Sequence, residues 1–190
     1  DAGFTYPFIV KPDVGMKGML FRKIETEEQL IRYHERIPVE YIVQDLVELP
    51  VEVSVFYYRY PDQQKGRVSG FIHKELLQVK GNGESTLKEL IQEHPRAKFR
   101  MDEMEHRHGH RFNRIIPKDE TFYLSYAGNH NRGAHFTNLH KEIDEDLQKV
   151  FDDLSHYTDK FFYGRYDIKT TSIEDLKKGR NFLILEFNGC

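Results

Sequence analysis

The sequence predicts an α+β fold in which antiparallel sheets pack against a few helices. Short β-rich runs recur along the chain, and helical runs lie between some of them without regular strand–helix alternation. Hydrophobic residues make up 38% and charged residues 31% of the 190 positions, a globular balance sufficient for one domain or two small ones. The net charge of −3 and the mean hydropathy of −0.68 argue against a nucleic-acid partner and a membrane span.

The first sixty residues predict strands around one helix. "YPFIVKP" (6–12) is an apolar strand, "DVGMKGM" (13–19) a glycine-containing loop, and "LFRKI" (20–24) a partner strand. Thr26 precedes "EEQLIRYHER", in which acids come first and bases last, as is typical of a helix. Residues 40–61 are β-rich with a break near Leu49 and Pro50.

The middle of the chain is more mixed. "GRVSGFIHKELLQV" continues the strands, and Thr86 with Glu89 predicts a capping box for a helix over residues 87–93. The highly charged residues 94–120 predict helix plus loop. A strand at 121–126 leads into "AGNHNRGAHFTN", which predicts a loop.

The last fifty residues predict a helix and two strands. Apolar residues recur every three or four positions from Lys141 to Phe161, which indicates an amphipathic helix. "YGRYDIKT" and "NFLILEFN" are the strands, and between them Ser172 would cap a short helix that Gly179 ends.

The final strand carries two polar residues in an apolar run. Glu186 and Asn188 are two positions apart and therefore share a face, while Leu185 and Phe187 are expected to face the core. If this strand pairs with "YGRYDIK", Asp167 joins them. Carboxylate and amide oxygens suit Mg²⁺ or Mn²⁺, which predicts half of a metal–nucleotide site. The alternative is that Glu186 pairs with Arg165 or Lys169 at a sheet edge.

A second set of residues suits an anion. Lys11 ends a strand, Gly15 and Gly18 allow close approach of the backbone, and Lys17 adds charge at the tip of the loop. The loop fits neither the Walker A pattern nor the Rossmann fingerprint, and an ordinary hairpin turn is the alternative. "YIVQDLVE" reads as a strand leading into a polar link between two lobes, or as a plain edge strand.

Taken together and in order, these segments resemble the ATP-grasp superfamily, in its D-alanine–D-alanine ligase-like and cyanophycin-synthetase-like branches. "PFIVKP" with "GMKGM" is similar to the lysine strand and phosphate loop, and "YIVQDLVELPVEVSV" to the hinge strand. "VKGNGESTLKELI" is similar to a "GDGxxTxxELI" stretch of the second branch. "YGRYDIK" followed by "LILEFNG" resembles the paired metal motifs.

The resemblance implies a role for each matching residue. Phosphate contacts fall to Lys11, Gly15, Lys17 and Gly18, adenine contacts to Gln44, Asp45 and Val47, and the ribose contact to Glu52. Lys74 is a candidate contact for the distal phosphate, and Arg165 would face the reacting phosphoryl group. Magnesium ions, or Mn²⁺, would be held by Asp167, Glu186 and Asn188.

The implied fold is ATP-grasp, with a small lobe over residues 1–47 and a large lobe over 48–190 that clamp Mg-ATP. The implied activity is ATP-dependent ligation of a small-molecule or peptide carboxylate to an amine through an acylphosphate. Alternatives are a non-catalytic nucleotide-binding module of this fold and a structural α+β domain. Both ends run close to strands, so we expect a fragment that lacks an N-terminal substrate domain and a C-terminal tail.

Three further features allow other interpretations. His106, His108 and His110 suggest a zinc site, a solvated basic face or contacts to an anionic substrate. Arg132, in a glycine loop, suits a bidentate contact to a carboxylate or phosphate, or lies in a plain connection. Cys190 is the only cysteine, which favours a reducing, cytoplasmic setting.

Overall fold

The computed structural model describes residues 3–14, 18–157 and 160–189, and the chain folds as two compact units. The first unit comprises Asp1–Leu46 and Leu76–His135, and the second comprises Val47–Glu75 and Phe136–Cys190. Residues 76–135 thus group with the N-terminal segment, whereas the sequence placed them in the lobe 48–190. The assignment of two nucleotide-clamping lobes stays a prediction.

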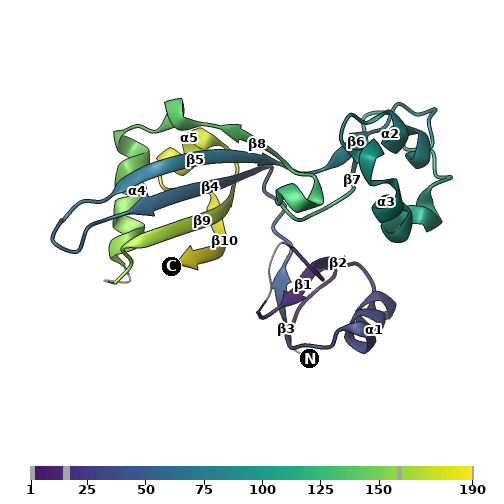
Figure 1. Ribbon diagram of the computed structural model, residues 1–190, viewed down its shortest axis with the longest axis horizontal. Helices are drawn as coiled ribbons and strands as arrows, with labels where there is room; N and C mark the ends of the chain where they lie inside the picture. Colours follow the sequence, from purple (N-terminus) through teal and green to yellow (C-terminus); the bar gives the residue numbers. More distant parts are fainter. Residues whose placement is uncertain (1–2, 15–17, 158–159, 190) are drawn as a thin grey trace. The chain divides into compact units, whose positions relative to one another are not determined.

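The N-terminal part of the first unit is a three-stranded antiparallel sheet with one helix (Figure 1). The strand order is β2 (Arg22–Ile24), β1 (Phe8–Pro12) and β3 (Tyr41–Asp45), and the helix is α1 (Glu27–Arg36). The helix begins as predicted, because the Thr26 side chain accepts a hydrogen bond from the Gln29 N–H. Apolar side chains of the strands and helix share a small core: Phe8, Val10, Ile24, Leu30, Tyr33, Tyr41 and Val43.

The rest of the first unit packs short helices against a two-stranded antiparallel sheet. The strands are β6 (Gln78–Lys80) and β7 (Thr121–Tyr123), and the helices are α2 (Leu87–Glu93) and α3 (Met101–His108) with the 3₁₀ turns η1 (Ala97–Arg100), η2 (Gly109–Arg111) and η3 (His130–Arg132). The capping box of α2 is confirmed, with Thr86 and Glu89 each bonding the other's backbone N–H. The charged stretch 94–120 is ordered by an apolar core that includes Met104 and Ile116, both fully buried.

The second unit is built on a five-stranded sheet (Figure 1). The strand order is β10 (Phe182–Gly189), β9 (Tyr163–Thr170), β4 (Val51–Tyr58), β5 (Arg67–Glu75) and β8 (His135–Asn138), and the first three neighbouring pairs are antiparallel. The helices are α4 (Glu145–His156), α5 (Ile173–Lys177) and the 3₁₀ turn η4 (His140–Glu142). The α+β class with antiparallel sheets is confirmed. β8 occupies the end of the stretch predicted as a loop.

One face of this sheet packs against α4 and α5. The strands contribute Val53, Val55, Tyr57, Phe71, Tyr166 and Ile168, and the helices contribute Leu147, Phe151 and Leu176, all buried. The helix α4 is shorter than the predicted span 141–161, because the Asp144 side chain caps its start by accepting from the Leu147 N–H. Ser172 caps α5 as predicted, and Gly179, with φ of +66°, follows its end.

The position of β10 corrects one expectation. β10 is an edge strand, so its apolar side chains are only partly covered: Leu183 is 53% and Phe187 is 47% exposed. The Phe187 ring does contact Phe161 and Tyr166, at centroid distances of 4.2 and 5.0 Å. Phe187 therefore faces the core side of the sheet as expected, but at the sheet edge it flanks the core and is not buried in it.

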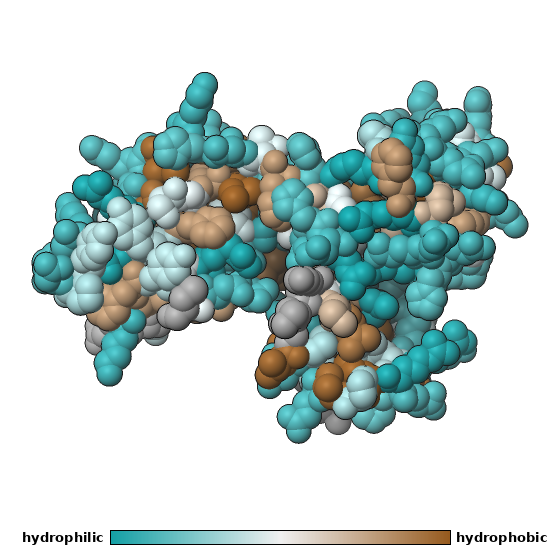
Figure 2. Space-filling view, viewed as in Figure 1, coloured by the Kyte–Doolittle hydropathy of each residue, from teal (hydrophilic) through white to brown (hydrophobic). Residues whose placement is uncertain are grey.

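Hydrophilic side chains dominate the face of the molecule shown in Figure 2, and hydrophobic ones form smaller patches. No helix among the described residues is long and apolar enough to cross a lipid bilayer.

Candidate functional site

The candidate site lies on the face of the five-stranded sheet opposite its apolar core. Alternation along β9 turns Tyr166 and Ile168 to the core and Arg165 and Asp167 to the other face. Asp167 lies directly opposite Ser54 on β4 and Glu186 on β10. These three side chains therefore form one row across three strands.

Two further rows flank this one. Glu52 lies opposite Lys74 on β5 and Lys169 on β9, and Arg165 lies opposite Asn188 on β10. We call the resulting set the charged face; its members are Glu52, Ser54, Lys74, Arg165, Asp167, Glu186 and Asn188. All belong to the second unit, and all except Ser54 were predicted as site residues from the sequence.

A bulge in β10 brings Glu186 to this face. Ile184 pairs with Ile168, on the core side, while Glu186 pairs with Asp167, so Leu185 is an extra residue in the strand. With regular alternation Glu186 would share the face of Ile184. The bulge reverses the alternation at this point and sets Glu186 opposite Asp167.

Asp167 is the centre of the hydrogen-bonding network. Its Oδ1 lies 2.9 Å from Lys74 Nζ and accepts from Ser54 Oγ and, at 2.9 Å, from Arg165 Nε. Its Oδ2 accepts from Arg165 Nη2 at 2.9 Å, which makes the guanidinium contact bidentate. Asp167 is 6% exposed, so this carboxylate is held by donors rather than by bulk solvent.

Glu52 completes the buried charges. Lys74 Nζ lies 3.9 Å from Glu52 Oε1, and both residues are 7% exposed. Burial raises the pKa of Glu52, and the nearby Lys74 and Lys169 only partly offset this. Burial also acts to raise the pKa of Asp167, but Lys74, Ser54 and Arg165 outweigh it and hold that pKa below its ordinary value.

The Asn188 side chain links Arg165 on β9 to Glu186 on β10. In the amide orientation that satisfies both neighbours, it accepts from Arg165 Nη2 and donates to Glu186 Oε1, each at 3.1 Å. Glu186 itself is exposed, whereas Asn188 is half-buried. The Glu-x-Asn pair of β10 is therefore tied to β9 through Arg165.

A hard divalent cation suits the chemistry of this set, which offers carboxylate and amide oxygens. Glu186 and Asn188 lie at the open edge, but both Asp167 oxygens already accept from cations or from Ser54. Asp167 would have to exchange one of these partners for a metal ion. Within residues 3–14, 18–157 and 160–189, no group of three or more His, Cys, Asp or Glu side chains is arranged to hold a metal.

The remaining predicted residues lie on other elements. Lys11 and Gln44 share the face of the three-stranded sheet that points away from its core, and Asp45 ends β3. The chain passes from the first unit to the second between Leu46 and Val47, within the predicted hinge segment. In the phosphate loop, Gly18 has φ of +64°, while Gly15 and Lys17 lie outside the described residues, as does Cys190.

Arg132 belongs to the first unit and is ion-paired with Glu103 at 2.9 Å. The three histidines of α3 and η2 are dissimilar in their surroundings. His106 and His110 are exposed, whereas His108 Nε2 donates to the Leu124 carbonyl at 3.0 Å, and burial lowers the pKa of His108.

Sequence reasoning missed Ser54. The signal was present, since "VEVSV" places Glu52 and Ser54 two positions apart in an apolar strand, like the Glu-x-Asn pair of β10. What the sequence did not show was that these two polar pairs lie on the same face, on either side of β9.

Comparison with models of protein families gives no match, and comparison with curated protein sequences gives none either. Among solved structures, the chain is similar to a bifunctional glutathione synthetase from Pasteurella multocida, with a TM-score of 0.40 and 14% sequence identity. The similarity covers 96% of this chain but 27% of that protein. A likeness at this level does not establish a family, and function is argued below from the residues of this chain.

Proposed function

We propose that the chain is part of an ATP-grasp ligase that binds Mg-ATP and joins a carboxylate to an amine. The observation that carries this proposal is the charged face, in which Asp167 and Glu186 lie directly opposite each other beside Arg165 and Asn188. Two carboxylates facing each other on neighbouring strands repel. Their placement together is unfavourable for stability alone and becomes favourable where a divalent cation binds between them.

The burial of three charged side chains of the charged face supports a role for them in ligand binding rather than in folding. Taking Lys74, Asp167 and Glu52 out of water costs free energy that their mutual attraction offsets only in part. A sheet that needed only stability would be served as well by apolar side chains at these positions. Cations held beside carboxylates in this way are ready to exchange partners with an anionic ligand.

Each residue then has a distinct task in the proposed site. Lys74 and Arg165 neutralise the phosphoryl oxygens, and Glu52 accepts from the ribose hydroxyls. Asp167, Glu186 and Asn188 would hold magnesium, which when bound neutralises charge on the phosphates. The resemblance adds Lys11 and the loop of Gly15, Lys17 and Gly18 for the phosphates, and Gln44, Asp45 and Val47 for adenine. Arg132, by the chemistry of its guanidinium, would contact a reacting carboxylate or phosphate.

The proposed reaction has two transfers. A carboxylate oxygen of the first substrate attacks the γ-phosphorus, and ADP leaves with the bridging oxygen. The amine nitrogen of the second substrate then attacks the acyl carbon, phosphate leaves, and the nitrogen loses a proton. The chain supplies orientation and charge neutralisation, so the reaction needs no nucleophile from the protein.

Two alternatives differ in what they predict. A non-catalytic nucleotide-binding module binds Mg-nucleotide but does not turn over ATP when carboxylate and amine substrates are supplied. A purely structural charged face binds no nucleotide. The charged face favours binding over the structural alternative, for the reasons of repulsion and desolvation given above.

Thermal unfolding with ADP, with and without Mg²⁺, tests the proposal. Ligand at about 100 times its Kd adds roughly 2.7 kcal/mol of stability, which is on the order of 5–10 °C for a chain of this size. We expect such a shift to require Mg²⁺ and to be lost in Glu186→Ala. The matched control is Glu145→Ala, which removes an exposed carboxylate in the first turn of α4.

A shift that persists in Glu186→Ala would refute the placement of the metal. A chain whose midpoint does not respond to Mg-ADP would refute nucleotide binding. Where binding is found, release of phosphate from ATP in the presence of carboxylate and amine mixtures separates the ligase from the non-catalytic module.

A further inference from the structure

A cluster of arginines belongs to the first unit, whereas the charged face belongs to the second. Glu103, on α3, accepts from Arg107 and Arg132 at its Oε1, at 3.1 and 2.9 Å, and from Arg100 at its Oε2, at 3.1 Å. Arg22, on β2, is close enough to repel Arg107 and Arg132 and to attract Glu103. We call these four arginines, together with Glu103, the arginine cluster.

The charges of the arginine cluster do not balance. Four guanidinium groups carry four positive charges against the single negative charge of Glu103. Burial lowers the pKa of Arg107, and repulsion from its neighbour Arg22 lowers it further. Burial and repulsion from Arg132 act in the same direction on the pKa of Arg22. The cluster is therefore held together against net repulsion, and an additional anion would relieve it.

Within the described part of the chain, one donor of the cluster lacks an acceptor, and a second guanidinium lacks a carboxylate partner. Among the described residues, Arg132 Nε is buried and has no hydrogen-bond acceptor. Arg22 donates to the carbonyl of Phe21 at 2.8 Å, and no carboxylate of the described chain lies within 4.0 Å of its guanidinium. A buried guanidinium N–H left without an acceptor costs free energy, which is why unpaired donors indicate a ligand.

A cavity opens beside Arg22 and Arg107. It has a volume of about 680 Å³, lies within the first unit, and is lined in part by Arg22 and Arg107. That volume is typical of a site for an organic molecule and exceeds what an inorganic ion fills. Tyr33, Phe122 and Tyr126 contribute aromatic surface to its wall.

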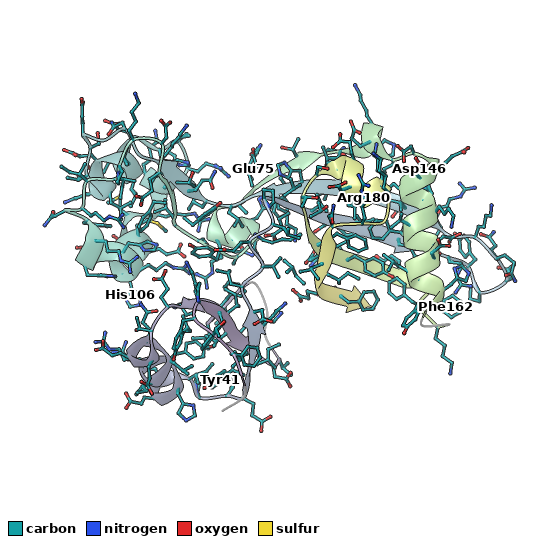
Figure 3. The ribbon with its side chains drawn as sticks, turned by 180° about the vertical axis from the view of Figure 1, so that it is seen from behind. Tyr41, Glu75, His106, Asp146, Phe162 and Arg180 are labelled. Atoms are coloured by element: carbon teal, nitrogen blue, oxygen red, sulfur yellow. The ribbon has the colours of Figure 1, made fainter. Side chains whose placement is uncertain are left out.

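Other arginines also line the cavity. Among them, Arg114 lies 2.9 Å from Glu120, which pairs with no second cation among the described residues, whereas Arg111 lies 3.5 Å from Glu25, a carboxylate that it shares with Lys23. His106, labelled on α3 in Figure 3, is exposed and also lines the cavity. Arg22 and Arg107 are the two residues that bring the unbalanced charge of the arginine cluster to the cavity wall.

We infer that the first unit binds a small organic anion carrying two or more negative charges, with its oxyanion groups held by Arg22 and Arg107 and its body in the adjoining cavity. Guanidinium groups bind carboxylate and phosphate oxygens in the same bidentate manner, so the shared chemistry is that of a polyvalent oxyanion. Every residue involved belongs to the first unit. Arg132 and Gly18, which lines the cavity, also have tasks in the proposed function, but the inference rests on the unbalanced charge and the cavity and not on nucleotide binding.

Calorimetric titration with citrate, glycerol 3-phosphate and acetate, at constant ionic strength kept with NaCl, tests this inference. We expect citrate or glycerol 3-phosphate to bind and acetate to bind at least about tenfold more weakly. Preference for citrate would identify a polycarboxylate, and preference for glycerol 3-phosphate a phosphate ester. The binding is expected to persist in Glu186→Ala, which separates it from the nucleotide site.

Matched variants locate the site. Arg107→Gln is expected to weaken binding at least about tenfold, whereas Arg114→Gln, in the same cavity wall but paired with Glu120, changes it less than about twofold. Glu103→Gln removes the competing carboxylate, so binding is expected to tighten even though the unliganded variant melts at a lower temperature. A merely structural role of Glu103 would not produce these opposite effects.

A second readout does not depend on a variant that folds. In ¹⁵N–¹H spectra of the unmodified chain, the Nε–H resonances of Arg22 and Arg107 are expected to shift on addition of the anion that binds. The inference is overturned if no probe binds, if acetate binds as tightly as the polyvalent anions, or if binding leaves both resonances unmoved.

Discussion

Replacing Lys74 by Met is the sharpest test of the charged face as a coupled network. The ammonium lies 2.9 Å from Asp167 and 3.9 Å from Glu52, all three being buried. At an effective dielectric constant of about 20, those distances correspond to gross attractions of about 6 and about 4 kcal/mol. Desolvation of the ammonium offsets much of this, and breaking a buried pair from one side costs about 3–5 kcal/mol in net terms.

We expect Lys74→Met to lie near the lower end of that range, at about 3 kcal/mol. Asp167 keeps Ser54 and its bidentate contact with Arg165, so the uncompensated charge is mainly that of Glu52. For a chain of this length, about 3 kcal/mol corresponds to roughly 6–12 °C in the unfolding midpoint.

The loss is expected to depend on pH in a defined direction. The pKa of Glu52 is raised by burial in the folded chain, and removing Lys74 raises it further, so folding then favours the protonated carboxyl. A raised carboxyl pKa means that stability falls as pH rises from the unfolded-state value through the folded-state value. Lys74→Met should therefore cost less at pH 5 than at pH 8.

Urea unfolding followed by circular dichroism measures these differences. The control is Lys149→Met, since Lys149 pairs with Asp153 on α4 but is 74% exposed, and an exposed pair of this kind contributes little to stability. Adding Glu52→Gln to Lys74→Met should restore part of the stability. A loss below about 1 kcal/mol, or an equal loss at both pH values, would refute the coupling of these charges.

Three further predictions concern the first unit. Gly133→Ala should cost at least about 1–2 kcal/mol in urea unfolding, because φ is +86° and the new Cβ would lie 2.7 Å from Leu77, whereas Gly109→Ala, with ordinary contacts, should be neutral or stabilising. Thr86→Ala removes the capping box of α2 and should cost about 1 kcal/mol; no change would show that the cap does not hold the helix. The pKa of His94 is lowered by burial and by Arg96, so stability should fall as pH drops below about 6.5, and His94→Asn should lose less between pH 7.5 and 5.5; parallel pH profiles would contradict this.

The sequence predicts those elements whose signals are local. The boundaries of α1, α2 and α5 follow from caps and terminal charges within four residues of the helix starts at Thr26, Thr86 and Ser172. The strands of the charged face were found because apolar residues alternate with a few polar ones. Such a pattern shows whether a segment is a helix or a strand, whatever elements pack against it in the fold.

Features that depend on distant partners were not predictable. The row that joins Ser54 to Asp167 spans more than a hundred residues of chain, and no local pattern reports that pairing. The bulge at Leu185 changes which side chains of the edge strand share a face, and it is seen only when β10 is paired with β9. The arginine cluster likewise draws Arg22 together with Arg132, and only tertiary packing brings them close.

Paramagnetic broadening by Mn²⁺ is the most direct test of the central claim, that the charged face binds a metal–nucleotide complex. ¹⁵N-labelled chain would be titrated with ADP, first with Mg²⁺ and then with a small fraction of Mn²⁺ in its place. The account predicts selective broadening of the Asn188 side-chain amide and of backbone amides around Asp167 and Glu186, which requires ADP and disappears in Glu186→Ala. Sharp resonances at those positions, with broadening confined to other parts of the chain, would contradict it.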